Sequence, residues 1–415
     1  MSDHPIATPE QHEHELAALR LIEHPIVQEA YGRVYDHWLA EMDPSPAMRA
    51  CFDWAFREVM FSAAIWSSNQ DPLRPKVIAI TRLEHPLGDR TVPGSRWGID
   101  NPDSIYRVIP ISGDEKYKIH GRVAERRLTE NYFTLWDPNM NTVGLLSGHD
   151  LVLNEDRTFT ITVDSDPAGD RPNHIQSCSE AHEFYIRDVM LDWALDESNE
   201  LQIERLGAEP ATPPMSEDEQ AELTASFMLR YADFTRGLSG GMLRGKPNRF
   251  ALAYSADKGG ALRNQFYVGG HFKLAEDEVF VVRVQDGGAA YFVVPLANVW
   301  GTTMDIVDRT SSLNKAQSVP DGDGAYTYVL SPEDPGVHNW LDTCGLHEGM
   351  LTLRMAEFPD GKPRDDLEAR GEVVKKADLK TYLSDSTTWL DAAARKRQQE
   401  QRAQAYLRRL PEAAR

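Results

Sequence analysis

The chain has 415 residues, of which 41% are hydrophobic, and a formal net charge of −21 at pH 7. Its length exceeds that of a usual single domain and predicts two domains with helical additions. The negative charge argues against nucleic acid as a partner, because such binding depends on Lys and Arg neutralising phosphates. No apolar run is long enough to span a bilayer, and the polar N-terminus lacks the order of a signal peptide. We therefore expect a cytoplasmic protein without a membrane partner.

Cysteine usage and motif content also exclude several classes of protein. Cys51, Cys178 and Cys344 are far apart and odd in number, which argues against a disulfide framework and a structural zinc site. The sequence has no G-x-G-x-x-G after a strand, no P-loop, no nucleophile elbow and no H-E-x-x-H helix. We therefore expect neither a metal nor a cofactor.

The first 76 residues are predicted to form an N-terminal helical cap. Apolar and aromatic side chains recur at helical spacing over 24–68 and predict two helices there. Ser45 and Pro46 suit the beginning of the second helix, as cap and first-turn residue. Because rings occur on nearly every turn, these helices should pack against a larger body.

From 77 to 206 the hydrophobic period changes to two, in short segments such as SIYRVIPI and NYFTLW. Residues 207–248 are predicted as a linker and a bridging helix, with a capping box at 216–219. A second β region covers 249–360, and a helical tail covers 361–415. The fold class is thus mainly β with α additions: two antiparallel β-sandwich or jelly-roll-like domains. No short internal repeat is visible.

The tail contains a basic run, ARKRQQEQRAQAYLRR, at 394–409. We predict that it forms a solvated helix face. A contact with nucleic acid or lipid is the alternative.

Three polar and aromatic clusters next to strands are the candidates for a site. The first, RWGIDNPDSIY at 96–106, contains Trp97, Asp100, Asn101, Asp103 and Tyr106. Its Asx side chains could satisfy their own backbone in a turn. The same carboxylates, amide and phenol could equally grip a polyhydroxylated or phenolic ligand, and the sequence leaves both readings open.

The second cluster, RTSSLN at 309–314, offers hydroxyls and Asn314, either to a ligand or to hold a long loop in place. The third is DPGVHNWLDTCGLHEGMLTLR at 334–354. Here Asp342 could orient His347 as a general base, and Arg354 could hold an anionic group. Asn339 and Trp340 complete this cluster.

In their order along the chain, these clusters resemble a bacterial family of domains of unknown function, family twelve-fourteen, which often occurs in tandem with a companion domain. The resemblance covers roughly residues 90–360, and DPGVHNWLDT is its most specific part. It implies a double jelly-roll-like fold, here in a single-chain form with an N-terminal helical cap, but no agreed catalytic role. The motif positions that match are Asp100, Asn101, Asp103, Tyr106, Asn314, Asp334, Asn339, Trp340, Asp342, His347 and Arg354.

Relatives of this single-chain form resemble proteins of aromatic and other small-molecule catabolism. One activity implied by that setting is the cofactor-free release of formaldehyde from a lignin-derived phenolic alcohol. We therefore expect a cofactor-independent lyase acting by acid–base chemistry on a small aromatic or polyhydroxylated molecule. The expected catalytic residues are His347, Asp342 and Tyr106. Those expected to bind substrate are Trp97, Asp100, Asn101, Asp103, Asn314, Asn339, Trp340 and Arg354.

A carbohydrate- or metabolite-binding jelly roll without chemistry of its own is the alternative, because the same side chains would serve it. In either case the expected partner is a small molecule. Homo-oligomerisation is expected on general grounds.

Overall fold

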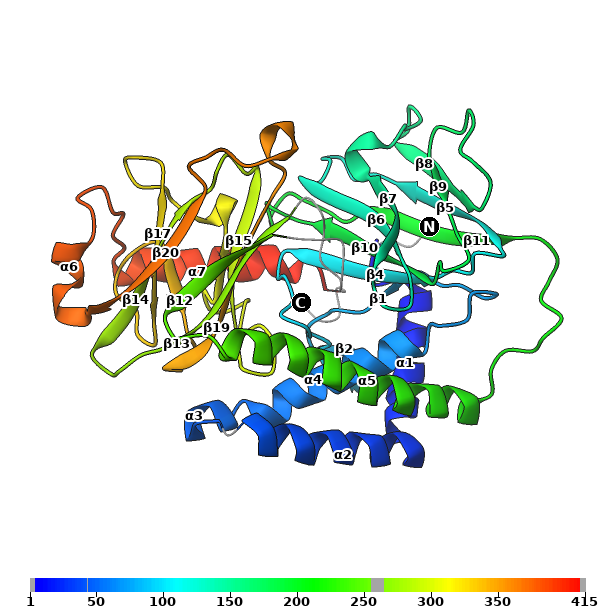
Figure 1. Ribbon diagram of the computed structural model, residues 1–415, viewed down its shortest axis with the longest axis horizontal. Helices are drawn as coiled ribbons and strands as arrows, with labels where there is room; N and C mark the ends of the chain where they lie inside the picture. The colour runs from blue at the N-terminus through cyan, green and yellow to red at the C-terminus, as the bar shows by residue number, and fades with distance from the viewer. Residues whose placement is uncertain (1–3, 43, 255–264, 411–415) are drawn as a thin grey trace.

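Two β-sandwiches lie side by side, and helices pack along one side of both (Figure 1). The computed structural model describes residues 4–42, 44–254 and 265–410. Parts of the expected cap, second β region and tail, namely 1–3, 43, 255–264 and 411–415, lie outside the described residues. The fold is mainly β with α additions, as the sequence predicts.

The first sandwich pairs a five-stranded sheet of order β1-β4-β10-β6-β7 with a four-stranded sheet of order β11-β5-β8-β9. Apolar side chains at alternate positions fill the space between these sheets, among them Phe133, Ile161 and Phe184. A separate two-stranded ribbon joins β2 (His85–Leu87) to β3 (Arg90–Val92). The strands of the sandwich are β1 (Ile78–Ala79), β4 (Ser104–Pro110), β5 (Lys116–Arg122), β6 (Glu130–Trp136), β7 (Thr142–Ser147), β8 (Thr158–Asp164), β9 (His174–Gln176), β10 (Glu183–Val189) and β11 (Glu200–Leu206).

The second sandwich is built in the same way. Its sheets have the orders β12-β13-β19-β15-β16 and β18-β17-β14-β20. Its strands are β12 (Arg249–Tyr254), β13 (Phe266–Lys273), β14 (Glu278–Gln285), β15 (Tyr291–Ala297), β16 (Ser312–Asn314), β17 (Tyr326–Ser331), β18 (Trp340–Asp342), β19 (Glu348–Ala356) and β20 (Glu368–Lys375).

The two sandwiches are therefore a topological repeat. If the strands of each are counted along the chain, leaving out the β2–β3 ribbon, the five-stranded sheet has the order 1-2-8-4-5 in both and the four-stranded sheet 9-3-6-7 in both. The sixth and seventh strands pair in parallel in both sandwiches, as β8 with β9 and β17 with β18. The sequence shows no short repeat because the corresponding strands preserve a hydrophobic pattern rather than particular residues.

Helices α1 to α5 form a layer along one side of both sandwiches, in which α1 contacts β1 and α5 contacts β13 and β19, whereas α6 packs against β20 and α7 lies behind the second sandwich (Figure 1). The bridging helix α5 begins with the predicted capping box, in which Ser216 and Glu219 bond each other's backbone N–H. It contacts α2 and α4 and then reaches β13 and β19 of the second sandwich. The helices are α1 (Pro9–Glu23), α2 (Pro25–Met42), α3 (Pro46–Arg49), α4 (Phe52–Ser67), α5 (Glu217–Leu243), α6 (Leu379–Tyr382) and α7 (Ala392–Leu407).

The region after Asp360 differs from the expected helical tail, since β20 completes the four-stranded sheet of the second sandwich. Half of the residues in its sequence, EARGEVVK, are charged and half are exposed, so the period-two apolar signal is weak there. The basic run also differs from a solvated face. Arg395, Arg402 and Arg409 are buried, and Arg402 Nε donates to the Ile306 carbonyl at 2.8 Å.

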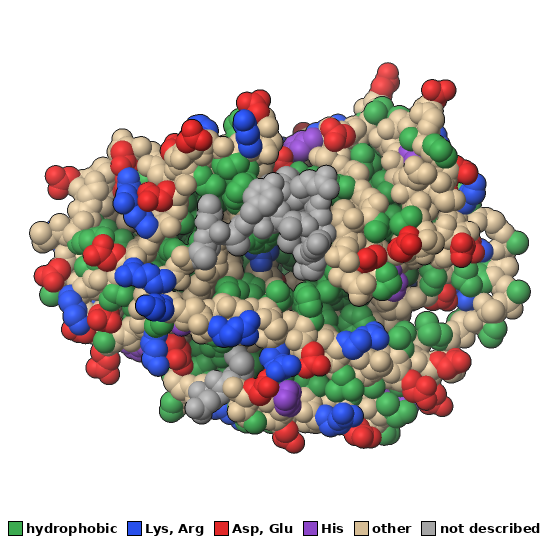
Figure 2. Space-filling model, viewed as in Figure 1, with side chains coloured by type: hydrophobic (Ala, Val, Ile, Leu, Met, Phe, Trp, Pro, Cys, Tyr) green, Lys and Arg blue, Asp and Glu red, His purple; other side chains and the backbone are tan. Residues whose placement is uncertain are grey.

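On the face shown in Figure 2, acidic and basic side chains are interspersed over the coloured surface. Within the described part of the chain, no helix combines the length and the apolar character that crossing a bilayer requires.

Candidate functional site

A cavity of about 390 Å³ lies where the two five-stranded sheets and α5 meet. Aromatic side chains dominate its lining, and a few charged and hydroxyl groups reach into it, which is the usual composition of a small-molecule site. The residues around it include Trp97, Ile99, Asp100, Tyr106, Trp136, Tyr185, Arg187, Phe234, Leu238, Met242, Tyr267, Val268, Gly269, Thr352 and Arg354.

The alternation of strand residues explains why these side chains share one space. On β10, Phe184 and Ile186 point into the first sandwich, so Tyr185 and Arg187 point outward to the cavity. On β19, Thr352 lines the cavity in the same way. The outer faces of both five-stranded sheets thus form two walls of the cavity.

The two walls place the same pair of residue types at corresponding positions. Arg187 lies opposite Tyr106 in the β10–β4 register, and Arg354 lies opposite Tyr267 in the β19–β13 register. Each guanidinium also packs over the ring of its cross-strand tyrosine, with centroid distances of 5.9 Å and 5.7 Å. The cavity therefore contains two Arg–Tyr pairs, one from each sandwich.

The Tyr106 hydroxyl of the first wall accepts a hydrogen bond from Arg354 of the second wall and so connects the two walls. Its oxygen lies 3.0 Å from the backbone N–H of Asn101 and 3.4 Å from Nη1 of Arg354, and both groups donate to it. Within the described residues, no acceptor takes the proton of this hydroxyl. Tyr106 can therefore give a proton to, or take one from, a ligand in the cavity.

The segment before Tyr106 has an unusual backbone. Ile99, a β-branched residue, has a φ of 60°, which is rare for such side chains and requires support from its surroundings. That support comes from Gly301, whose carbonyl accepts the Ile99 N–H at 2.7 Å, and from Arg354, whose Nη2 donates to the Ile99 carbonyl. These two hydrogen bonds hold the strained segment against the guanidinium.

Burial and neighbouring charges shift the acidities around the cavity. Burial raises the pKa of Tyr267, although the guanidinium groups of Arg187 and Arg354 oppose the rise. Burial, together with the charge of Glu357, raises the pKa of Glu130 to about 8. A hydrogen-bonded chain connects the two groups, because the Tyr267 hydroxyl donates to Gln265, which in turn donates to Glu130.

Several polar atoms of the lining are buried without a hydrogen-bond partner among the described residues, namely Thr352 Oγ1, Arg354 Nε and Trp136 Nε1. Buried polar atoms are usually paired in folded proteins. Such a group of atoms around one cavity fits a ligand that carries oxygen.

The structure brings four of the expected site residues to this cavity: Trp97, Asp100, Tyr106 and Arg354. Asp100 is already engaged, because its carboxylate accepts the N–H and the hydroxyl of Thr303 at 3.1 Å and 2.8 Å. Tyr106 and Arg354 are the two expected residues that offer polar groups to a ligand.

Asn101, Asp103 and Asn314 do lie close together, but in a buried hydrogen-bond network between the two sandwiches and not in the cavity. The Asp103 carboxylate accepts from Trp193 Nε1 at 2.7 Å, from the Tyr291 hydroxyl at 2.8 Å and from Asn314 Nδ2 at 3.0 Å. Asn101 Nδ2 donates to the same tyrosine. All are buried, so their contacts join the two halves of the molecule.

Asn339 and Trp340 also have structural contacts. Both the amide nitrogen and the amide oxygen of Asn339 bond the backbone of Val319. Trp340 Nε1 donates to the Ser331 carbonyl at 3.1 Å, and the ring lies under the Arg395 guanidinium. This part of the third cluster secures a loop and the tail helix α7.

The structure does not form the expected Asp342–His347 pair. Asp342 accepts from Arg309 Nη1 at 3.0 Å and from the Cys344 N–H at 2.8 Å. Within the described residues, no hydrogen bond joins it to His347, whose Nδ1 is buried without a partner. Since β19 is extended at about 3.3 Å per residue, His347 lies roughly 20 Å along the strand from Arg354, outside the cavity.

The residues missed by sequence reasoning are Trp136, Tyr185, Arg187, Tyr267 and Thr352. Thr352 lies within the third cluster but was not singled out there, and the other four lie within segments assigned only as strands. A usable signal was present, since Tyr185 and Arg187 alternate and so share one face of β10. Which of the two faces bordered a cavity depended on how the sandwiches pack.

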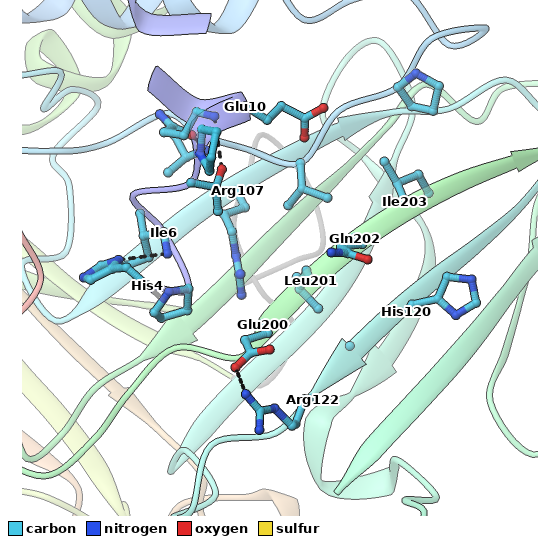
Figure 3. Close-up of a pocket in the computed structure, with 18 of the residues that line it drawn as sticks. His4, Ile6, Glu10, Arg107, His120, Arg122, Glu200, Leu201, Gln202 and Ile203 are labelled. Carbon is cyan, nitrogen blue, oxygen red and sulfur yellow. Dashed lines mark hydrogen bonds and ion pairs between the residues drawn. The ribbon is translucent and has the colours of Figure 1, made fainter. Parts of the chain in front are cut away.

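A second, larger cavity of about 840 Å³ lies at the edge of the first sandwich, between β11 and the segment that leads into α1 (Figure 3). Its charged residues bond one another or nearby groups. Arg122 bonds Glu200, and Arg107 bonds Asp188 and the Asn199 carbonyl. None of the expected site residues lines it. Of these two cavities, the first lies between the sandwiches and contains expected site residues, so we take it as the candidate site.

Within the described ranges, no group of three or more His, Cys, Asp or Glu side chains is arranged to hold a metal ion.

No family model matches the chain, and no curated protein matches it. Among solved structures it is similar to an uncharacterised protein from Burkholderia cenocepacia, with a TM-score of 0.73 and 22% identity over 87% of this chain and 100% of that chain. A structural-genomics target from Vibrio parahaemolyticus covers 67% of this chain and 90% of its own at 13% identity, with a TM-score of 0.39, too low to carry an argument. The Burkholderia protein shows that the fold is shared, and it carries no functional name.

Proposed function

We propose that the cavity between the sandwiches binds a small aromatic molecule that carries oxygen, and that the protein acts on it as a cofactor-independent lyase. The observation that carries this proposal is the Tyr106 hydroxyl, held by the Asn101 N–H and by Arg354 at the wall of an aromatic cavity. Membership of family twelve-fourteen and a cytoplasmic location remain expectations from the sequence. The proposal moves the proton-transfer role from His347 to Tyr106.

The proposed chemistry is a retro-aldol-type cleavage. The Tyr106 hydroxyl takes the proton of a substrate hydroxyl while it passes its own proton on, and the C–C bond next to the hydroxyl-bearing carbon breaks. That carbon becomes a carbonyl carbon, and the departing carbon keeps the electron pair of the broken bond and receives the proton given by Tyr106. The nearby Arg354 guanidinium stabilises the negative charge that develops on oxygen. No oxidant, reductant or nucleotide takes part in this balance.

A binding protein without chemistry is the second candidate. It is favoured by the lining of the cavity, which contains no histidine among the described residues and so offers no imidazole base beside Tyr106. Aromatic stacking and a guanidinium serve binding as well as catalysis.

One experiment separates these candidates. The purified protein is incubated with a panel of one-ring phenolic alcohols and with a sugar panel, while product mass and thermal shift are both followed. The lyase predicts release of a small aldehyde from a phenolic alcohol, and Tyr106→Phe should lower the rate by about 10²–10⁴ while the ligand still raises the melting temperature. Tyr117→Phe, which removes a hydroxyl bonded to the Pro72 carbonyl away from the cavity, is the matched control. A thermal shift without product contradicts the lyase and supports binding alone.

A further inference from the structure

The difference between the two walls of the cavity indicates where a ligand ring lies. With Arg187 matched to Arg354, the strand registers make Tyr185 correspond to Thr352 and Trp136 to Ala297. On the first wall, Trp136 and Tyr185 stack at 4.2 Å with 17° between their planes. On the second wall, a hydroxyl side chain and a methyl group stand in their places.

The second wall is also open beside Thr352. Its cross-strand neighbour on β13 is Gly269, which has no side chain, whereas Tyr185 faces Val108 on the first wall. A β-carbon on Gly269 would meet only the Met242 side chain of α5, at 3.1 Å. Gly269, Thr352 and Met242 all line the cavity. Beside Thr352 the cavity therefore occupies space that the Tyr185 ring fills on the first wall, whereas Ala297, at the place of Trp136, is packed against Ile99 and α5.

We propose that a single aromatic ring of the ligand binds beside Thr352, at the position on the second wall that corresponds to the Tyr185 ring on the first. The inference rests on the proposed function and names its substrate class as a one-ring phenol or aromatic alcohol. Thr352 then determines which ligands fit, because a larger side chain there would take the ring's place.

Two buried polar atoms also support this assignment, and their evidence does not depend on the size of the space beside Thr352. Thr352 Oγ1 and Arg354 Nε have no hydrogen-bond partner in the part of the chain that the structure describes. They stand two residues apart on β19, which places both on the same face of the strand. Thr352 is 7% exposed, so water satisfies its hydroxyl poorly. An oxygen substituent on a ring beside Thr352 would pair with one or both atoms and would be directed toward Tyr106.

Two substitutions at one position test the proposal. Thr352→Tyr gives the second wall the ring of the first, and Thr352→Val removes only the hydroxyl at nearly constant volume. The matched control is Thr310→Val, at a buried threonine whose Oγ1 also lacks a partner but which lies outside the cavity. Affinities for phenol, 4-hydroxybenzyl alcohol and toluene are measured by calorimetry, together with the melting temperature of each variant.

We expect Thr352→Tyr to lower the affinity for all three probes by at least about tenfold. Thr352→Val should lower the affinity for the two oxygenated probes by about fivefold to tenfold, as expected for one hydrogen bond, and leave toluene unchanged. Thr310→Val should leave all three unchanged.

The possible failures are distinguishable. If the native protein binds the probes and both Thr352 variants bind them equally well, the ring lies elsewhere and this inference is wrong, while the role of Tyr106 stands. If the native protein binds none of the probes, the aromatic site itself is wrong and the proposed function falls with it. If Thr352→Tyr does not fold, the test depends on Thr352→Val. A loss of affinity for the two oxygenated probes but not for toluene supports the proposal, and unchanged affinity for all three probes contradicts it.

Discussion

The two sandwiches have the same strand order but different outer faces. At corresponding positions, the first presents Trp136 and Tyr185, and the second presents Ala297 and Thr352. The Arg–Tyr pair is kept on both walls. The first wall is thus filled by its own rings, whereas the second leaves space.

This difference shows how a repeated scaffold gives rise to a site. If the two walls carried the same side chains, aromatic rings would fill the space on both walls, or both walls would leave it open. A cavity with a stacked ring pair on one wall and open space beside Thr352 on the other requires the outer faces of the repeat to differ. The interior faces remain apolar in both sandwiches, because each must still pack against its own four-stranded sheet.

The largest effect on stability should come from disrupting the hydrogen-bond network that joins the two sandwiches. Asp103 belongs to the first sandwich and accepts from Tyr291 and Asn314 of the second. Asp103→Ala leaves these buried donors unpaired and should lower the free energy of unfolding by roughly 3–5 kcal/mol in urea titrations. Asp323→Ala removes an exposed pair with Arg283 and should cost less than about 1 kcal/mol. Equal losses in the two variants would show that the network does not join the halves.

Making the first wall resemble the second should have the next largest effect. Tyr185→Thr removes a buried ring that stacks on Trp136, and should destabilise the protein by about 3 kcal/mol. It should also open space for a larger ligand, so that 2-naphthol, weakly bound by the native protein, binds more tightly relative to phenol. Calorimetry of both ligands measures this ratio. A ratio that does not change would mean that the two walls are not equivalent in the sense inferred from their registers.

The two sandwiches also differ at one buried position, where the first has the carboxylic acid Glu130 and the second has Tyr291. The pKa of Glu130 is raised from 4.5 to about 8 by burial and Glu357. Between these values the folded chain holds a proton that the unfolded chain has released, so this group's contribution to stability falls as pH rises from 4.5 to 8. In Glu130→Gln, the melting temperature should decline less over that window.

Glu183→Gln provides a comparison for the pH dependence, because burial raises the pKa of Glu183 to about 7. Its substitution should flatten the decline mainly below pH 7. If Glu130→Gln leaves the profile between pH 7 and 8 as steep as in the native protein, Glu130 is ionised in the folded state and the assignment is wrong.

The smallest effect is expected at His347, which lies at the far end of β19 from the cavity. His347→Asn should change the affinity for phenolic probes, and any turnover of them, by less than about twofold, because no contact connects His347 to Tyr106 or Arg354 in the described residues. Paired rate and affinity measurements check this. A tenfold loss in either would restore the acid–base role that the sequence predicts for this residue.

The sequence predicted the fold class because period-two segments, turn residues and the Ser216–Glu219 capping box are local signals. It did not reveal the repeat, since the same apolar periodicity is met by different residues in the two halves. It also missed β20, whose charged, exposed strand lacks a strong alternation of apolar residues.

For the site, the sequence identified Tyr106 and Arg354, which the fold brings to within 3.4 Å from positions far apart in the chain. It also selected Asp103, Asn314 and Asp342, which have the residue types of a site but find partners inside the protein. A carboxylate looks the same in a sequence whether its neighbours leave it free or surround it with donors. The catalytic pair expected at Asp342 and His347 depended on a contact that no local pattern can establish.

By itself, the sequence determined the strongly alternating strands, the amphipathic helices of 24–68 and the bridging helix, because these follow from propensity and periodicity within a few residues. Only the tertiary structure decided which outer faces meet, which polar groups are satisfied and where space is left. Those outcomes depend on the packing of two sandwiches and a helix whose contacting residues are separated by most of the chain.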